Sequence, residues 1–569
     1  MNTNLTPSMT GAQLLVDALK THGADHVFCV PGESYLAVLD ALYEERDHIR
    51  LVTCRHEGGA ANMAEAHGKL TGRPGICMVT RGPGATNASI GVHTAMQDST
   101  PMILFVGQVA REASDREGFQ EVDYTSFFGG MAKWVAQIES ADRVTEYVTR
   151  AFQVACAGRP GPVVLALPED MLLDEVQPRK VRPFKSIQAS PAPQEIAQLV
   201  ALLEAAERPM LLLGGPGWDP TSCQQMTAFA EANDLPIACA FRFQDLVDNE
   251  HPNYVGDVGV GINPALARRI KGSDLLVAIG PRLGEMTTGG YTLIDTPLPQ
   301  LPLVHVHPGA EELGSVYQAD LMINSGMRHF AAALARLPRL ASSEKRRMAT
   351  AEARQDYLRW TSRVEIDSDV QMWDVIQMLQ GAIPRDAIIT NGAGNYTGWA
   401  HRFYRYGGFR TQLAPTSGAM GYGVPAAIAA KIVCPDRTVI ALAGDGCYLM
   451  NGQEIATAVH EQANVIIVVV NNGIYGTIRM HQEREFPGRT IATHLTNPDF
   501  AAYARAFGAH GETVTRTDQF PEALARCLAS DKPSLIEIKL NPEAITPTAT
   551  LSGIRQAALK SKTNEVGRT

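Results

Sequence analysis

The sequence predicts an α/β protein made of three doubly wound domains, each built on a parallel sheet. Short apolar runs alternate with helical patterns along the whole chain, and most of the runs end at Gly or Pro. A length of 569 residues with 45% hydrophobic residues is enough for about three to four domains that each bury a core. A Pro-rich stretch at 178–193 and a charged helical pattern at 342–363 separate three groups of runs.

These separators set the expected domain boundaries. We expect a first domain at 1–177, a second at 190–345, a third at 370–548 and a tail at 549–569. Some of the apolar runs, such as 464–470, are continuous, which is typical of parallel strands that are covered on both faces. The expected strands are 25–30, 75–79, 162–167, 208–215, 274–280, 303–307, 438–443 and 464–470.

Composition excludes several classes of function. A net charge of −10 without a basic cluster argues against nucleic acid or an anionic membrane as a partner. Nine scattered cysteines without a CxxC pair indicate reduced thiols and not a disulfide framework or a zinc site. The N-terminal residues lack the pattern of a signal peptide, and no run approaches the roughly 18 apolar residues of a membrane span. We therefore expect a cytoplasmic protein.

The segment after the strand at 438–443 carries the strongest chemical signal. Gly444 and Gly446 are expected to let the backbone turn sharply beside an anion, while Asp445 points a carboxylate at it. A helical pattern then leads to the strand at 464–470, which delivers the amide of Asn472 beside Asp445. Mg²⁺ usually binds a few oxygen atoms of the protein, and phosphate oxygens of a ligand complete its coordination shell. The alternative is an ordinary βαβ crossover that ends in Asn-Asn.

This Gly-Asp-Gly…Asn-Asn pattern resembles the cofactor motif of the thiamine diphosphate (ThDP)-dependent enzymes. Three more segments match the family in order and spacing, namely 54–65, 80–87 and 415–427. The resemblance implies that Mg²⁺ holds the diphosphate of ThDP. Its implied protein ligands are Asp445, Asn472 and the main-chain oxygen of Ile474.

The resemblance also implies further contacts with ThDP, at Gly32, Glu57, Asn395, Tyr396, Gly418, Met420, Gly444, Gly446 and Tyr475. Met420 stands where the family places the residue that bends the cofactor, although a Met between small residues also suits plain core packing. Asn395 and Tyr396 stand where a strand-to-helix turn can offer N–H groups to phosphate, and a turn without a ligand is the alternative.

Glu57 corresponds to the glutamate that activates the cofactor in this family. Gly58, Gly59, Ala60 and Ala61 follow it, so its carboxyl group can be desolvated and can share a proton with the pyrimidine ring of ThDP. The alternative role is an N-terminal charge that favours the helix dipole.

Within the family, the acetolactate (acetohydroxyacid) synthase branch is the most similar. The segments 118–123, 131–134 and 151–162 resemble that branch, and Gln120 and Lys133 are expected to orient the carboxylate of a 2-keto acid. A loop-capping Gln120 and a solvated Lys133 are the alternatives. The segment 475–481 lacks the tryptophan of the branch, and Glu33 stands where the synthases usually have glycine, so the acceptor substrate stays open.

We therefore expect a decarboxylating carboligase that converts pyruvate or a similar 2-keto acid to an acyloin and CO₂. The alternatives are a 2-keto acid decarboxylase or dicarbonyl lyase, a non-catalytic ThDP-binding or regulatory relative, and a flavin oxidase of the pyruvate-oxidase type. FAD is a further candidate cofactor, because Arg282 falls where an arginine contact is expected, although the Met-His-Gly segment of flavin-binding synthases is absent. The resemblance also implies a homodimer or homotetramer with active sites between subunits.

Overall fold

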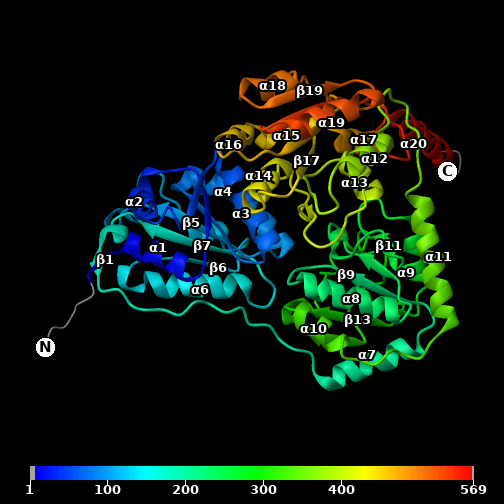
Figure 1. Cartoon of the computed structure of the whole chain (residues 1–569), viewed down its shortest axis with the longest axis horizontal. Helices are drawn as coiled ribbons and strands as arrows, with labels where there is room; N and C mark the ends of the chain where they lie inside the picture. Colours follow the sequence, from blue (N-terminus) through cyan, green and yellow to red (C-terminus); the bar gives the residue numbers. More distant parts are fainter. Residues whose placement is uncertain (1–6, 567–569) are drawn as a thin grey trace. The chain divides into compact units, whose positions relative to one another are not determined.

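The computed structural model describes residues 7–566, which divide into two compact units, with the boundary along the chain between Ala189 and Ser190. Figure 1 traces the elements along the chain. The units contain three six-stranded sheets in which every strand pair is parallel, and β1 (Met9–Thr10) pairs antiparallel with β8 (Glu175–Val176). The predicted fold class is therefore confirmed. Among the described residues, no helix combines the length and apolarity that a bilayer crossing requires.

The first unit is a sheet covered by helices on both faces. Its strands lie in the order β3 (Arg50–Thr53), β2 (His26–Cys29), β4 (Gly75–Val79), β5 (Met102–Gln108), β7 (Pro162–Pro168) and β6 (Trp134–Gln137). Alternate side chains such as Val27 and Cys29 pack with the helices α1 (Gly11–Thr21), α2 (Leu36–Glu44) and α6 (Val144–Cys156). Phe28 points to the other face, where α3 (Glu57–Thr71) packs on the sheet and against α4 (Gly82–Asp98). The short α5 (Tyr124–Phe128) precedes β6.

The second unit begins with a sheet of the same kind. Its strands lie in the order β11 (Tyr254–Asp257), β10 (Ile237–Cys239), β9 (Pro209–Leu213), β12 (Leu275–Ile279), β13 (Leu303–His307) and β14 (Leu321–Asn324). One face packs against α7 (Pro193–Ala205), α8 (Pro220–Ala232) and α10 (Met327–Leu334), and the other packs against α9 (Pro264–Lys271). The long α11 (Glu344–Trp360) then leads to the last sheet (Figure 1).

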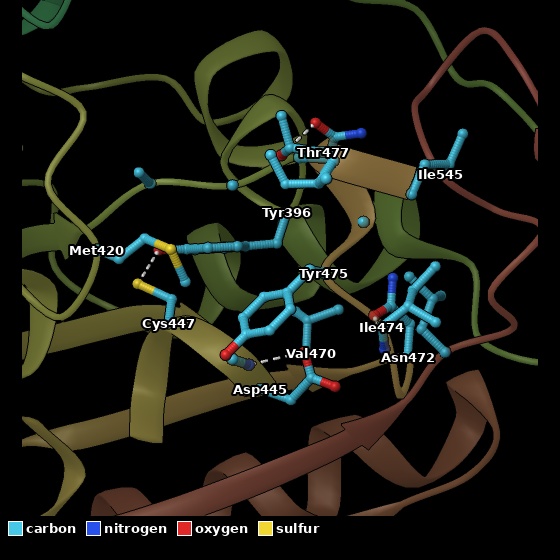
Figure 2. Close-up of a pocket in the computed structure, with 18 of the residues that line it drawn as sticks. Tyr396, Met420, Asp445, Cys447, Val470, Asn472, Ile474, Tyr475, Thr477 and Ile545 are labelled. Atoms are coloured by element: carbon cyan, nitrogen blue, oxygen red, sulfur yellow. Dashed lines mark hydrogen bonds between the residues drawn. The ribbon is translucent and has the colours of Figure 1, made fainter. Parts of the chain in front are cut away.

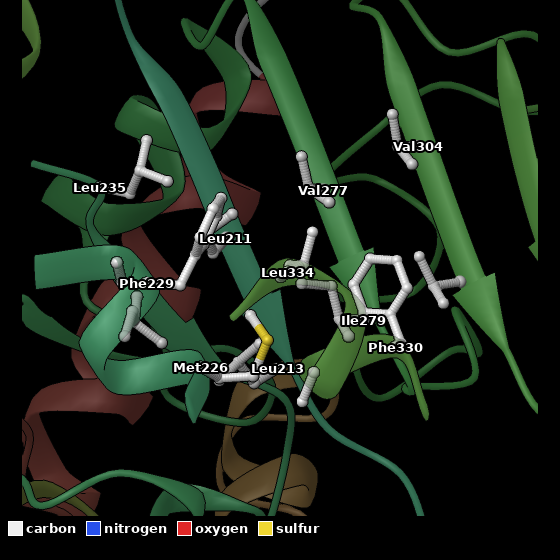
Figure 3. Packing of buried hydrophobic residues seen from close by; sticks show 14 of the residues in the cluster. Leu211, Leu213, Met226, Phe229, Leu235, Val277, Ile279, Val304, Phe330 and Leu334 are labelled. Carbon is white, nitrogen blue, oxygen red and sulfur yellow. The ribbon is translucent and has the colours of Figure 1, made fainter. Parts of the chain in front are cut away.

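The core between α8, α10 and this sheet is made of interlocking apolar side chains (Figure 3). Phe330 of α10 lies among the strand residues Val277, Ile279 and Val304, and it is fully buried. We predict that Phe330→Ala lowers the free energy of unfolding by about 3–5 kcal/mol, because the cavity cannot fully collapse. Urea unfolding followed by circular dichroism measures this change. Leu298→Ala is the control, because that side chain is exposed and its loss should change stability by less than about 0.5 kcal/mol.

The last sheet has the order β16 (Gln412–Leu413), β15 (Ile388–Asn391), β17 (Val439–Gly444), β18 (Ile466–Asn471), β20 (Ser534–Lys539) and β19 (His510–Val514). The helices α12 (Met372–Ala382), α13 (Thr397–Phe403) and α19 (Phe520–Ala529) pack into a core on one face. The strand order reverses between β15 and β17, since the chain runs from β15 to β16 on one side and then to β17 on the other. In open α/β sheets, the crevice at such a reversal is the usual place for a ligand.

The remaining helices of this region are α14 (Gly423–Val433), α15 (Asp445–Asn451), α16 (Ile455–His460), α17 (Gly476–Glu485), α18 (Phe500–Ala506) and α20 (Leu551–Val566). The segment that the sequence predicts as a tail thus contains α20, which packs against α17.

Candidate active site

A pocket opens at the carboxyl ends of β15, β17 and β18, beside the reversal of strand order (Figure 2). Every residue of this unit that the sequence predicts to contact ThDP or Mg²⁺ lines it, together with residues that the sequence does not predict, such as Cys447, Thr477 and Ile545. The predicted residues are Asn395, Tyr396, Gly418, Met420, Gly444, Asp445, Gly446, Asn472, Ile474 and Tyr475. The three strand ends therefore bring together segments that are far apart in the sequence.

Asp445 is the first residue of α15 and its side chain faces this pocket. It is 3% exposed, and three donors hold its two oxygens: Gly446 N at 2.9 Å, Gly473 N at 2.8 Å and Asn497 Nδ2 at 2.7 Å. Burial raises the pKa of Asp445, while these hydrogen bonds act in the opposite direction. The carboxylate is thus fixed in place and largely removed from water.

The two asparagines after β18 have different surroundings. Asn471 Oδ1 accepts hydrogen bonds from Gly473 N and Asn497 Nδ2, and its Nδ2 donates to Glu537, so this side chain belongs to the framework around Asp445. The side chain of Asn472 lines the pocket instead, with Ile474 N donating to its Oδ1 at 3.3 Å.

The glycines on either side of Asp445 are needed for a different reason from the predicted one. The sequence predicts that they allow a sharp turn, yet Gly444 ends β17 with a φ of −81° and Gly446 lies within α15. A Cβ atom at Gly444 would come within 2.8 Å of the Tyr396 ring, and one at Gly446 would come within 2.6 Å of the Tyr475 ring. Close approach of the two tyrosine rings therefore requires both glycines.

The loop from β15 to α13 forms the opposite wall of the pocket. Gly394 has a φ of +138°, a conformation that favours glycine. Thr477 Oγ1 donates to Asn395 Oδ1 at 2.8 Å, which joins this loop to α17. Tyr396 OH accepts from Gly392 N at 3.0 Å and donates to Cys447 Sγ at 3.3 Å. These bonds hold Asn395 and Tyr396 at the pocket.

Met420 lies beside Tyr396 and Cys447 in Figure 2, on a loop in which Gly418 and Gly421 both have a positive φ. Its side chain is partly exposed and lines the pocket, so it is not used only to fill the core. This placement leaves it available to contact a bound molecule.

The residues of the pocket fit a magnesium-bound diphosphate. Among the described residues that line it, Asp445 alone carries a charge, and a buried carboxylate without a cation is costly. Oxygen donors are the ligands that Mg²⁺ prefers, and Asp445 and Asn472 both supply them. Gly394, Gly444 and Gly446 let the rings of Tyr396 and Tyr475 pack closely against the backbone, so these two rings form the pocket wall beside Asp445.

Glu57, Gly32 and Gln120 belong to the first unit. Glu57 begins α3 and is partly exposed, and its Oε2 accepts a hydrogen bond from Asn87 Nδ2 of α4 at 2.9 Å. The start of α4 lies between Glu57 and Gln120, since Gly84 approaches Glu57 Oε1 and Gly82 N donates to Gln120 O at 2.9 Å. The structure therefore places Glu57 and Gln120 at the same helix terminus.

Gly32 and Gln120 each have a distinctive backbone. Gly32 follows β2 and packs so closely on Thr80 that a Cβ atom would come within 2.4 Å of the Thr80 Cβ. Gln120 has a φ of +64°, which is uncommon for a residue other than glycine and is seen in functional loops.

Lys133 lies away from this group. It precedes β6, at the amino end of the parallel sheet, whereas Glu57 and Gly32 follow the carboxyl ends of their strands. Its Nζ donates to the carbonyl oxygens of Val154, Ala157 and Arg159, each at 2.7 Å, which occupies all three protons of the ammonium group. The geometry supports a structural role, and we leave Lys133 out of the substrate site.

Comparison with known proteins agrees with this geometry. Three family models match the chain in order: the N-terminal TPP binding domain of thiamine pyrophosphate enzymes at 9–127, the central domain at 196–334 and the C-terminal TPP binding domain at 392–538. The chain belongs to the thiamine pyrophosphate (ThDP) enzyme family. Together, the two TPP binding models cover every predicted cofactor residue, whereas Lys133, which was predicted to contact the substrate, lies outside them.

Similarity to acetolactate synthases spans nearly the whole of this ThDP enzyme. It is 32% identical to the acetolactate synthase isozyme 2 large subunit of Escherichia coli over 540 residues, which are 94% of this chain and 96% of that protein. It is 31% identical to the acetolactate synthase large subunit of Parasynechococcus marenigrum, covering 95% and 88% of the two chains. A probable acetolactate synthase large subunit of Methanocaldococcus jannaschii is 30% identical, covering 95% and 93%.

Asn497 is the clearest residue of this ThDP enzyme that sequence reasoning missed. Its Nδ2 donates both to Asp445 Oδ2 at 2.7 Å and to Asn471 Oδ1 at 3.0 Å, although it lies 52 residues after Asp445. We predict that Asn497→Ala weakens Mg²⁺-dependent ThDP binding by about 10–100-fold, because it removes the group that orients Asp445, the expected metal ligand. Calorimetric titration measures this affinity. Asn464→Ala serves as the control, because Asn464 precedes β18 at the end of the strand opposite the pocket, and equal affinities for Asn497→Ala and the unmodified enzyme would contradict the role.

A second group that the sequence did not reveal joins α20 to α17. The carboxylate of Glu483 is fully covered and accepts hydrogen bonds from Arg555 Nε at 2.7 Å, Gly488 N at 3.0 Å and Arg479 Nε at 3.2 Å. Arg555 is the main cause that lowers the pKa of Glu483 to about 2. Lys562 Nζ adds a bond to Glu485 O. Since α17 carries Thr477 and Ile478 of the pocket wall, this ion pair fixes one side of the pocket.

We predict that Arg555→Met weakens the docking of α20 by about 2 kcal/mol, less than for a fully buried pair because Arg479 still faces Glu483. Hydrogen exchange of the α20 amides should become faster, whereas Arg516→Met, at an exposed pair, should leave it unchanged. The pKa of Glu483 in the folded protein lies below the ordinary value of 4.5. The Glu483 carboxylate therefore stabilises the fold fully above about pH 4.5, and this stabilisation is lost as the pH falls toward 2. Unchanged exchange in Arg555→Met would show that α20 is held by other contacts.

Proposed function

We propose that this ThDP enzyme is a decarboxylating carboligase of the acetolactate synthase type. It takes a small 2-keto acid such as pyruvate, releases CO₂ and joins the remaining carbon unit to a second carbonyl compound to give an acyloin. The observation that carries the proposal is the pocket at the strand reversal, where a buried Asp445 is the one charge among glycines and asparagines. The similarity to acetolactate synthases over 94% of the chain supports the same reaction class.

In this proposal, Asp445, Asn472 and the main-chain oxygen of Ile474 hold Mg²⁺, which binds the diphosphate of ThDP. When bound, ThDP supplies an electron sink for the carbonyl carbon of the substrate. The protein contributes the rest: Asn395 and Tyr396 hold one wall of the pocket, Gly444 and Gly446 allow the rings of Tyr396 and Tyr475 to pack beside Asp445, and Met420 contacts the cofactor rings.

Glu57 supplies the acid in this proposal. One carboxyl oxygen is held by Asn87, which leaves the other free to hold a proton toward the pyrimidine ring. We propose a homodimer or homotetramer in which Glu57 of one copy completes the pocket of another, because the resemblance assigns the two parts to different subunits. Gln120, at the same helix terminus as Glu57, is the proposed contact for the substrate carboxylate. A cytoplasmic location is part of the proposal.

The acceptor is less well defined by the pocket. Met480 is partly buried beside Ile474 and Ile545, with its Sδ 3.4 Å from Asn395 Nδ2, whereas His481 and Glu33 are exposed. These three positions differ from the synthase pattern, so the second carbonyl compound need not be pyruvate. We treat the acceptor as open between pyruvate and another aldehyde or 2-keto acid.

FAD is a further candidate cofactor. Arg282 Nε lies 3.2 Å from Glu312 Oε2, so the guanidinium that would contact a flavin nucleotide already has an acidic neighbour. The small pocket around it is also lined by His305 and Tyr317. We propose that FAD, where present, binds weakly and has no redox role. Yellow absorbance in the enzyme as purified would count in favour of a flavin enzyme, and a colourless active enzyme would count against it.

Product analysis tests the proposal. The purified chain is incubated with pyruvate, ThDP and Mg²⁺, and CO₂, acetaldehyde and acetolactate are measured together. We expect CO₂ with acetolactate or another acyloin. Acetaldehyde alone would indicate a decarboxylase, and the absence of turnover with a panel of 2-keto acids, with ThDP bound, would indicate a non-catalytic relative. Asp445→Ala run in parallel shows how much of any turnover depends on the cofactor site.

A further inference from the structure

A second cluster of metal-ligating side chains lies in the first unit, at the amino end of β2. Asp25 Oδ1 is 2.9 Å from His26 Nδ1 and 3.2 Å from His67 Nε2, and all three ligand atoms lie within 4.8 Å of one another. It is the one group of three or more such residues found among the described residues. Asp25 and His26 precede or begin β2, and His67 projects from the later part of α3.

This cluster is separate from the catalytic residues. Gly32 and Glu57 follow the carboxyl ends of β2 and β3, whereas Asp25 and His26 lie at the opposite end of β2. His67 is ten residues after Glu57 in the same helix, which corresponds to about 15 Å along the helix axis. A ligand held here would therefore act on the framework of the unit and not on the reacting atoms.

Packing fixes the two imidazole rings. Phe28 stacks on His26 with ring centroids 6.4 Å apart and meets His67 edge-on at 6.2 Å. The rings of His26 and His67 are 5.7 Å apart. His67 is 4% exposed, whereas the carboxylate of Asp25 is 47% exposed, so the cluster has a rigid buried side and an entrance from solvent. Two ligands are thus pre-positioned before any ion arrives.

The donor set and its spacing suit zinc. Zinc–ligand bonds of about 2.0–2.1 Å place neighbouring donors of a tetrahedral site about 3.3 Å apart, close to the two distances from Asp25 Oδ1. Two imidazoles and one carboxylate favour Zn²⁺ over Mg²⁺, which prefers oxygen donors. His67 Nδ1 is buried without a hydrogen-bond partner among the described residues, so zinc binding through Nε2 would leave the ring proton on an unpaired Nδ1, a cost that the bond to the ion must exceed. The exposed side of Asp25 leaves the fourth position to water.

One neighbouring charge opposes a cation. Arg73 Nη1 lies 3.6 Å from Asp25 Oδ2, the oxygen that does not face the histidines. Both groups are about half exposed, so solvent screens much of this repulsion. Arg73 can also remain paired with Oδ2 while Oδ1 binds the ion.

We propose that Asp25, His26 and His67 form a zinc-binding site that joins the start of β2 to α3. The ion has a structural role: it holds together the strand that leads to Gly32 and the helix that begins with Glu57. This inference does not depend on the proposed reaction.

The test uses the enzyme saturated with Mg²⁺ and ThDP, so that the catalytic site is filled. Zn²⁺ is titrated calorimetrically, and Co²⁺ is used as a visible probe of four-coordinate geometry. We expect one tight site per chain and a rise of a few degrees in melting temperature with Zn²⁺. His67→Ala and Asp25→Ala should each weaken Zn²⁺ binding by at least about 100-fold and remove the rise in melting temperature. His48→Ala, at an exposed histidine of the same unit, is the control.

Asp25→Ala keeps the inference testable if His67→Ala fails to fold, because the Asp25 side chain is half exposed. Activity should be unchanged in both folded variants, since neither residue contacts the catalytic pocket. Zn²⁺ binding that is equally tight in wild type and Asp25→Ala, or the absence of any tight Zn²⁺ site in the saturated enzyme, would overturn the proposal. In that case the cluster is only a hydrogen-bonded His-Asp-His group.

Discussion

Glu57→Gln is expected to lower kcat by at least about 100-fold, while ThDP and Mg²⁺ still bind with nearly unchanged affinity. Glutamine keeps the shape of the side chain, and its amide oxygen can still accept the hydrogen bond from Asn87 Nδ2. It cannot, however, take up and release a proton. The loss should therefore affect the chemical step and not the binding of the cofactor.

Steady-state kinetics together with calorimetric titration of ThDP separate these two effects. Glu44→Gln is a suitable control, because it removes an exposed carboxylate from α2 of the same unit. Glu44→Gln should retain full activity. Full activity of Glu57→Gln would refute the assigned role, and a parallel loss of ThDP affinity would indicate that Glu57 positions the cofactor instead of activating it.

Asp445→Ala is expected to weaken Mg²⁺-dependent ThDP binding by more than about 100-fold. Loss of a group that only orients a metal ligand costs up to about 100-fold, and loss of the ligand itself should cost more. The carboxylate is the one charged group of the described pocket lining, so the pocket has no other anion to hold the metal. Activity should fall with binding and should not recover at any accessible Mg²⁺ concentration.

The variant also leaves Gly473 N and Asn497 Nδ2 without their carboxylate acceptor, so stability must be measured alongside binding. Asp436→Ala removes an exposed acid from the same unit and should change neither property. Normal ThDP affinity in a folded Asp445→Ala protein would place the metal elsewhere and contradict the account.

Much of the fold follows from apolar patterning. The predicted strand at 303–307 matches β13, and the predicted run at 464–470 lies within two residues of β18, Ile466–Asn471. Both strands are buried on both faces; in β18 this burial produces the unbroken apolar run that the prediction used, whereas β13 also carries the buried His305 and His307. Strands of two to four residues such as β3 and β16 give no periodic signal and were not predicted, and the longer strands β5 and β20 were also not among the predicted ones.

The sequence identified the pocket through residues whose types are tied to one chemistry, such as Asp445 and Asn472. It could not identify Asn497, because an asparagine in a loop has many roles and only the fold brings it to Asp445. For Lys133, the sequence predicted a role that the geometry does not support. Its position matched a family pattern, yet three carbonyl oxygens at the far end of the sheet occupy its ammonium group.

The packing of side chains around the pocket could not be predicted from the sequence either. The roles of Gly444 and Gly446 depend on where the rings of Tyr396 and Tyr475 lie, and those contacts span up to 48 residues of chain. The ion pair of Glu483 with Arg555 joins helices that are 72 residues apart. Such long-range contacts have no local sequence signal.

A crystal structure of the chain with ThDP and Mg²⁺ tests the central claim most directly. We predict Mg²⁺ bound to Asp445, Asn472 and the main-chain oxygen of Ile474, with the cofactor rings bent over Met420 and the pyrimidine ring beside Glu57 of a second copy. A diphosphate bound away from Asp445, or a pyrimidine ring with no Glu57 from any copy beside it, would contradict the account.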